Sequence, residues 1–128
     1  GETILLVEDN AEVLHTVRSM LTCLNYRVLV ARHGKEALEL HTVHRKDIAL
    51  VLSDMGMPEM GGRELYRAIR DVDPDLKFVA MSGYSIDTEG EADLKSGMSG
   101  LLAKPVTIED VAGIVSGVLK GEEANSGA

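Results

Sequence analysis

The chain has 128 residues and a formal net charge of −8, from 21 acidic residues against 13 lysines and arginines. This length suits one domain with a single hydrophobic core, and the acidity disfavours direct binding to the phosphate backbone of nucleic acids. The apolar runs are all shorter than the roughly 20 residues of a membrane-spanning helix, so we expect a cytoplasmic domain that makes no membrane contact itself.

The predicted domain covers residues 1–120. The tail, residues 121–128, has nothing apolar to bury and is predicted to be disordered. Because the chain begins with Gly1 rather than methionine, we expect it to be a piece of a longer protein.

Short apolar runs alternate with stretches that have helical apolar spacing. The runs are Ile4–Val7, Tyr26–Ala31, Ile48–Ser53, Phe78–Met81 and Leu101–Ala103. Such alternation is typical of βα units that build a parallel sheet. The first and third runs are apolar on both faces, which predicts central strands with helices on both sides. We therefore expect an α/β fold, a three-layer sandwich with a five-stranded parallel sheet and five helices.

Each helical stretch carries an apolar face. The faces comprise Leu14, Val17, Leu21 and Leu24; Ala37, Leu40 and Val43; Leu65, Ala68 and Ile69; and Ile108, Val111, Val115 and Val118. Asn10 and Thr107 precede the first and last of these stretches and are predicted N-caps. The remaining helix, between the fourth and fifth strands, is expected to be short or mobile, since Gly90 and Gly97 each lower helix propensity by about 1 kcal/mol.

Three side chains in the helices have chemistry that could suggest a metal site. Cys23 is the only cysteine, and we expect it to be a small buried hydrophobe in the first helix. His41 and His44 have i,i+3 spacing, but the neighbouring Arg45 and Lys46 would repel a cation. A solvated helix end is the better interpretation of the two histidines.

Polar side chains stand where the predicted strands end. Glu8 and Asp9 follow the first strand, Asp54 ends the third, Ser82 ends the fourth and Lys104 ends the fifth. In open parallel sheets, ligands bind outside the carboxyl ends of the strands. If the fold is correct, three acids, one hydroxyl and one ammonium converge on a single edge.

Three grouped carboxylates need a compensating charge. Two unit charges about 4 Å apart repel by about 4 kcal/mol near a protein surface, and a divalent cation would reverse this effect. An all-oxygen ligand set suits Mg²⁺. Lys104 suits a phosphoryl oxygen or a salt bridge to Asp54, and Ser82 could donate a hydrogen bond to the same phosphoryl oxygen. Asp54 is therefore predicted to be a nucleophile and a metal ligand.

These residues, in this order, resemble the receiver domain of two-component response regulators over residues 3 to 119. The matching segments are LLVEDN with the acid pair, VLSDMGMPEMGG with Asp54, MSGY with Ser82 and AKP with Lys104. The resemblance implies the flavodoxin-like strand order 2-1-3-4-5. It also implies that Asp54 accepts a phosphoryl group from a phosphohistidine on a histidine kinase or a histidine phosphotransfer domain.

The family likeness further implies the other site residues. Mg²⁺ would be held by Glu8 or Asp9, by Asp54 and by the backbone carbonyl of Gly56. The hydroxyl of Ser82 would move toward the phosphoryl group, and Lys104 would bind it. The peptide bond before Pro105 resembles one that is cis in the family. Such a domain assists its own phosphorylation and dephosphorylation and is not an enzyme that acts on separate substrates.

Two features bear on the wider context. Leu101 stands where the family commonly has an aromatic residue, so a rotating ring cannot report phosphorylation in this chain. The sequence MSGYS is similar to receivers at the C-terminal end of hybrid sensor histidine kinases, which would make the domain part of a membrane-anchored sensor. A partner or a second copy is expected to dock on the face formed by helix 4, strand 5 and helix 5, and phosphorylation could produce a homodimer.

The sequence also bears on three other functions. A phosphatase of the haloacid dehalogenase type would need a second aspartate at position 56, which is Gly56. A flavodoxin-like flavin binder would need a hydroxyl-rich phosphate loop after the first strand, where this chain has VEDNAEV. A degenerate receiver that acts only as a protein-binding module remains the alternative, although such a module is expected to lack the acceptor or the lysine.

Overall fold

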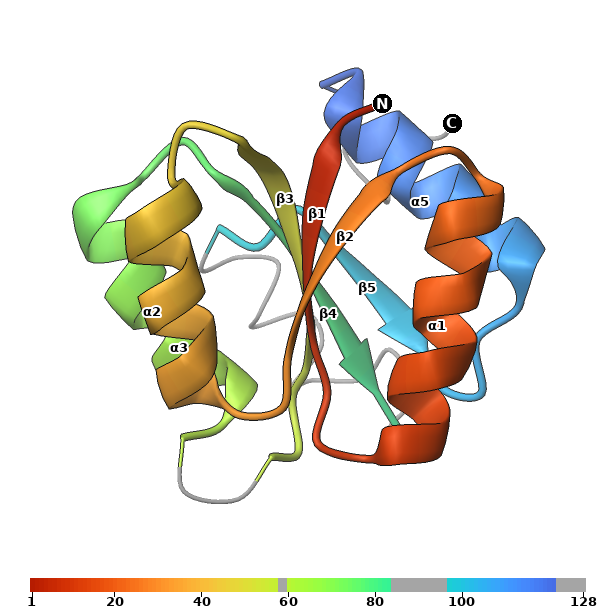
Figure 1. The fold of residues 1–128 in the computed structure, drawn as a ribbon, viewed down its shortest axis with the longest axis horizontal. Helices are drawn as coiled ribbons and strands as arrows, with labels where there is room; N and C mark the ends of the chain where they lie inside the picture. The colour runs from red at the N-terminus through yellow and green to blue at the C-terminus, as the bar shows by residue number, and fades with distance from the viewer. Residues whose placement is uncertain (58–59, 84–96, 122–128) are drawn as a thin grey trace.

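The computed structural model describes residues 1–57, 60–83 and 97–121 (Figure 1). The elements are β1 (Thr3–Val7), α1 (Ala11–Cys23), β2 (Arg27–Ala31), α2 (Gly34–His44), β3 (Ile48–Asp54), α3 (Gly62–Val72), β4 (Lys77–Ser82), β5 (Gly100–Ala103) and α5 (Ile108–Leu119). The predicted helix between β4 and β5 falls largely on residues 84–96, outside the described part. The predicted disordered tail likewise lies outside it, except for Gly121.

The five strands form one parallel sheet in the order β2-β1-β3-β4-β5. Both the parallel sheet and its strand order are confirmed. β1 and β3 are neighbours in the interior of the sheet, as their apolar character on both faces predicts.

Helices cover both faces of the sheet. In Figure 1, α2 and α3 lie on one side of the sheet and α1 and α5 on the other. Alternate residues of β1 therefore enter different cores. Leu5 and Val7 pack with the α2 and α3 side, whereas Ile4 and Leu6 pack with the α1 and α5 side. The three-layer sandwich is confirmed.

The predicted caps begin two of the helices. The side chain of Asn10 accepts hydrogen bonds from the backbone N–H groups of Glu12 and Val13 at the start of α1. The hydroxyl of Thr107 accepts one from the N–H of Asp110 at the start of α5. Both caps satisfy N–H groups that have no partner inside the helix. The cap of α1 also fixes where the chain turns after β1.

Three expectations about the helices were wrong. Cys23 is exposed, because it lies about 200° around α1 from the buried Leu21. In α2, His41 is buried, and Val43, about 200° from it, is 75% exposed. The burial of His41 is compensated by Asp73 at the end of α3, whose Oδ2 lies 3.1 Å from His41 Nε2.

Within the described residues, the helices are too short or too polar for any of them to cross a bilayer.

Candidate functional site

The predicted site residues all lie at the carboxyl edge of the sheet. Asp54 is the last residue of β3 and Ser82 the last residue of β4. Glu8 and Asp9 directly follow β1, and Lys104 directly follows β5. Parallel strands end at the same edge of a sheet, so the fold brings together residues separated by as many as 96 positions.

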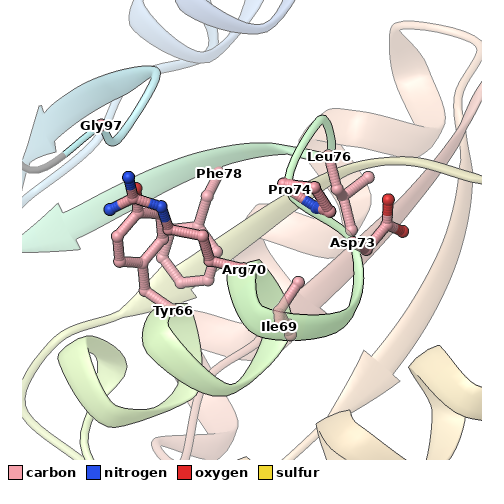
Figure 2. Close-up of a pocket in the computed structure, with 8 residues that line it drawn as sticks. All are labelled: Tyr66, Ile69, Arg70, Asp73, Pro74, Leu76, Phe78 and Gly97. Atoms are coloured by element: carbon pink, nitrogen blue, oxygen red, sulfur yellow. The ribbon is translucent and has the colours of Figure 1, made fainter.

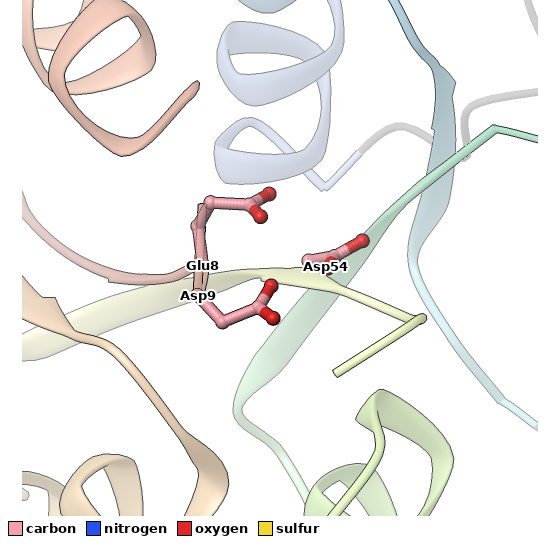
Figure 3. A group of neighbouring side chains, drawn as sticks. All are labelled: Glu8, Asp9 and Asp54. Atoms are coloured by element: carbon pink, nitrogen blue, oxygen red, sulfur yellow. The ribbon is translucent and has the colours of Figure 1, made fainter. Parts of the chain in front are cut away.

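Three carboxylates point into one space at this edge (Figure 3). Glu8, Asp9 and Asp54 each offer an oxygen atom, and these oxygens all lie within 4.8 Å of one another. Glu8 and Asp54 are buried, whereas Asp9 is exposed. A hard, oxygen-only ligand set with one open side fits Mg²⁺, which usually retains several waters when it binds to protein carboxylates.

Lys104 places a positive charge beside two of these carboxylates. Its Nζ donates a hydrogen bond to Glu8 Oε2 at 2.8 Å and lies 3.0 Å from Asp54 Oδ1. Burial alone would lower the pKa of Lys104, but the hydrogen bonds and the attraction to the two carboxylates outweigh burial and raise it. The ammonium group therefore stays charged and bridges β5 to β1 and β3.

Glu8 is the most enclosed member of the group. Its Oε1 accepts a hydrogen bond from the N–H of Asn10 at 3.1 Å, and its own N–H donates to the carbonyl of Ala31 at 3.0 Å. Burial raises the pKa of the Glu8 carboxyl. The hydrogen bonds from Lys104 and Asn10 lower it and offset this effect only in part. Sequence reasoning expected Lys104 to pair with Asp54 and missed the pair with Glu8, since no local pattern links positions 96 residues apart.

The other predicted site residues are Ser82, Gly56 and Pro105. Ser82 is buried, and its backbone carbonyl accepts a hydrogen bond from the N–H of Lys104 at 2.7 Å. Gly56 is exposed, and its N–H donates to Asp54 Oδ1 at 3.3 Å. The peptide bond between Lys104 and Pro105 is cis, the isomer that the family resemblance implies.

A second concave region lies away from the carboxylates, between α3 and β4 (Figure 2). The ring of Tyr66 packs edge-on against Phe78 with centroids 5.2 Å apart, and the guanidinium of Arg70 lies over Tyr66 at 5.9 Å. The cavity itself measures about 20 Å³, which is room for about one water molecule. This region is a packing feature and too small for an organic ligand.

Comparison with known proteins identifies the family. The family model described as "Response regulator receiver domain" matches residues 4–116. The chain belongs to this family. Receiver domains are the phosphorylatable signalling domains of two-component systems, and they bind Mg²⁺ in the active site.

Curated relatives of this receiver domain include small proteins and parts of large ones. The chain is 34% identical to a chemotaxis protein CheY homolog from Campylobacter jejuni, over 89% of this chain and 95% of that protein. It is 35% identical to the sensor kinase CckA from Brucella abortus, over 94% of this chain but 13% of the kinase. It spans 53% of the response regulator MprA from Mycolicibacterium vanbaalenii. The chain therefore matches only part of several relatives.

Solved structures of other receiver domains share the fold. A receiver domain protein from Clostridium thermocellum superposes with a TM-score of 0.89 at 25% identity, over 94% of this chain and 96% of that one. The receiver domain of the sensor histidine kinase PA1611 from Pseudomonas aeruginosa has a TM-score of 0.82 at 28% identity, over 94% of this chain and 98% of that one. Its structure contains a magnesium ion coordinated in the active site cleft.

Proposed function

We propose that this receiver domain takes a phosphoryl group from a phosphohistidine onto Asp54, in a reaction that depends on Mg²⁺, and changes conformation as a result. One observation carries the proposal. The Asp54 carboxylate lies 3.0 Å from the Lys104 ammonium and within a group of three acids whose oxygens are within 4.8 Å of one another. Such a group would be costly without a cationic ligand.

In the proposed transfer, an oxygen of the Asp54 carboxylate attacks the phosphorus atom. The bond between phosphorus and the imidazole nitrogen breaks as the new phosphorus–oxygen bond forms, and the imidazole leaves with the electron pair. The product on the chain is an acyl phosphate. Such transfers depend mainly on positioning and on the stabilisation of negative charge, and Lys104 already lies where it can neutralise that charge.

Mg²⁺ would be held by Asp9, by Asp54 and by the backbone carbonyl of Gly56. Glu8 is the third acid of the group. The ion supplies charge neutralisation at the phosphoryl oxygens. Glu8 is bonded to both Lys104 and the N–H of Asn10, so it also keeps the lysine beside Asp54. Ser82, at the end of β4, is proposed to bind the phosphoryl group through its hydroxyl and to carry the change toward the strands beside it.

The proposed partner is a histidine kinase or a histidine phosphotransfer domain. A surface groove of about 410 Å³ runs between the first turns of α1 and the segment from Lys104 to Val106. Val13 and Pro105 give the groove apolar contacts beside the lysine that would bind the phosphoryl group. A partner seated there would bring its phosphohistidine toward Asp54.

Several wider assignments are proposed alongside the transfer. We propose that residues 1–120 act as one receiver unit in the cytoplasm, with no direct contact to nucleic acid. The chain matches part of the sensor kinase CckA, which supports the proposal that this domain belongs to a hybrid histidine kinase. The domain would assist its own phosphorylation and dephosphorylation, and dimerisation on phosphorylation is proposed as an output.

The test is incubation with acetyl phosphate, with and without Mg²⁺, followed by intact-protein mass spectrometry. The wild-type chain should gain one labile phosphoryl adduct in the presence of Mg²⁺ only. Asp54→Asn should gain none, because the amide is a poor nucleophile.

The matched control is Asp71→Asn, which removes an exposed acid from the last turn of α3 and should react like the wild type. An adduct that persists in Asp54→Asn would remove Asp54 from its role. If the wild-type chain forms no adduct at all, the result contradicts the proposed phosphoryl transfer and favours the alternative of a protein-binding module.

A further inference from the structure

The first turn of α2 makes an unusually close contact with the loop that follows Asp54. A Cβ atom built on Gly34 would lie 2.6 Å from Sδ, 2.7 Å from Cγ and 2.8 Å from Cβ of Met60. Real Cβ atoms essentially never approach other heavy atoms this closely. Gly34 is not one of the glycines with positive φ, so glycine is needed here for space rather than for backbone conformation. The side chain of Met60 occupies that space.

The surface on which Met60 rests is firmly held. The N–H of Glu36 donates to His33 Nδ1 at 3.2 Å, and Glu36 Oε1 accepts from the N–H of Arg32 at 2.8 Å. His33 is the N-cap of α2, and the glutamate three residues later accepts from the N–H of Arg32, the residue before the cap, so the two hydrogen bonds together hold the entry to α2. Ala31, at the end of β2, accepts the hydrogen bond from the N–H of Glu8. The first turn of α2 is thus tied to the strand that carries the acid pair.

The loop is held at its other end as well. A Cβ atom on Gly62, the first residue of α3, would lie 2.8 Å from the carbonyl oxygen of Asp54 and 2.4 Å from Met55 Sδ. Two close contacts therefore hold described residues on both sides of Gly56: Gly62 packs on Asp54 and Met55, and Gly34 packs on Met60. The backbone carbonyl of Gly56 is a proposed metal ligand, and the N–H of Gly56 donates a hydrogen bond to Asp54 Oδ1.

We propose that Gly34 is a positioning residue for the metal and phosphoryl site and that it acts through Met60. The space above Gly34 lets Met60 dock on the rigid start of α2, and the docked methionine fixes where the chain enters α3, whose first residue packs on Asp54 and Met55. This inference rests on the proposed function for its connection to phosphorylation. The coupling to metal binding can be measured independently.

The experiment is a double-mutant cycle on the full chain, with Gly34→Ala, Met60→Gly and the combined variant. Met60→Gly is used because it removes all three atoms that a new Cβ would meet, whereas alanine at position 60 would retain one of them. Mg²⁺ affinity is measured by isothermal titration calorimetry, and the phosphorylation rate is measured with acetyl phosphate.

Gly34→Ala should weaken Mg²⁺ binding and slow phosphorylation by about tenfold, within the roughly hundredfold that small displacements at an active site can cost. In the Met60→Gly background, the same alanine should have little further effect, because the atoms it would displace are gone. Gly113→Ala is the matched control. Its new Cβ would meet nothing within 4 Å on the exposed face of α5, so both readouts should stay at the wild-type level.

If Gly34→Ala folds, two results would overturn the proposal. One is a folded Gly34→Ala variant with unchanged Mg²⁺ affinity, even if its stability has fallen. The other is an equal loss from Gly34→Ala in both backgrounds, which would mean that Gly34 acts without Met60. If Gly34→Ala fails to fold, the combined variant decides. The proposal is supported if the combined variant folds and binds Mg²⁺ with the same affinity as Met60→Gly. It is overturned if the combined variant also fails to fold. A wild-type chain that binds Mg²⁺ but accepts no phosphoryl group would refute the proposed function and leave the affinity cycle valid.

Discussion

At the scale of single residues, the ammonium group of Lys104 lies among the same carboxylates that would bind a metal ion. Its ammonium lies 2.8 Å from Glu8 and 3.0 Å from Asp54, so it partly neutralises the acids when no metal is bound. The folded chain depends on this lysine because Glu8 is fully buried, and a buried carboxylate without a partner is strongly unfavourable. The residues that we propose for chemistry are therefore also responsible for part of the stability.

Replacing Lys104 by methionine should lower the free energy of unfolding by about 2 kcal/mol without Mg²⁺. This lies below the roughly 3–5 kcal/mol for breaking a fully buried pair, because the lysine side chain is 24% exposed. The loss should be smaller in a Glu8→Gln background, which leaves no buried charge at position 8. Urea unfolding followed by circular dichroism measures both losses, and Lys46→Met, at an exposed lysine, is the control. If Lys104→Met lowered the free energy of unfolding equally in the wild-type and Glu8→Gln chains, the result would contradict the pairing of Lys104 with Glu8.

The same pair has a predictable pH dependence. Because the pKa of Lys104 is raised above its usual 10.5, the folded chain retains this proton at pH values where the unfolded chain has lost it. The contribution of Lys104 is therefore fully present below pH 10.5 and is lost as the pH rises through the raised pKa. The stability difference between wild type and Lys104→Met should shrink over that alkaline range.

At the scale of elements, the close packing of α3 against the end of β3 determines where Asp54 lies. The first residue of α3, Gly62, approaches the carbonyl of Asp54 and the Cα of Met55 so closely that a Cβ would lie 2.8 and 3.0 Å from them. Backbone atoms cannot rotate away as a side chain can. The helix and the strand end therefore behave as one rigid unit.

Gly62→Ala should destabilise the fold by about 1–3 kcal/mol, the usual cost of overpacking. Gly113→Ala is the same chemical change in open space on α5, and it should stabilise the fold by roughly 0.5–1 kcal/mol, because alanine is the better helix former. Thermal or urea unfolding of the two variants provides the comparison. A neutral Gly62→Ala would show that α3 can shift away from the strand at no cost.

At the scale of the whole molecule, the site joins strands that are distant in sequence but adjacent in the sheet. Glu8 and Asp9 follow β1, Asp54 ends β3, and Lys104 connects β5 to both. The unfolded chain holds these groups far apart. A ligand that needs the assembled group therefore binds the native state and stabilises the entire fold.

Mg²⁺ at a hundred times its dissociation constant should raise the free energy of unfolding by about 2.7 kcal/mol. Sodium chloride at the same ionic strength is the control, because it screens repulsion among the acids without bridging them. Asp9→Asn removes the exposed acid of the group. At the same Mg²⁺ concentration, this variant should show a smaller increase in the free energy of unfolding. If sodium chloride gave the same gain as Mg²⁺, the ion would be acting by screening alone.

The order of elements and the identity of the strand-end residues could be predicted from the sequence, because both depend on local patterns. The apolar runs marked the strands, the helical spacing marked the covering helices, and the polar residues that ended the runs marked the site. Local patterns were less reliable within α2, where His41 is buried and Val43 exposed. A histidine can be buried when a carboxylate from another element, such as Asp73, lies beside its ring. The spacing of residues within one helix does not show which residue of a neighbouring element will lie there.

Tertiary structure alone decided two contacts that the sequence did not predict. The pairing of Glu8 with Lys104 and the docking of Met60 on Gly34 join residues 96 and 26 positions apart, and each depends on how the strands and helices close on one another. Composition and periodicity determine the faces and ends of elements because these follow from neighbours along the chain. Contacts between elements follow from the packing of the complete fold, where distance in space no longer depends on distance in sequence.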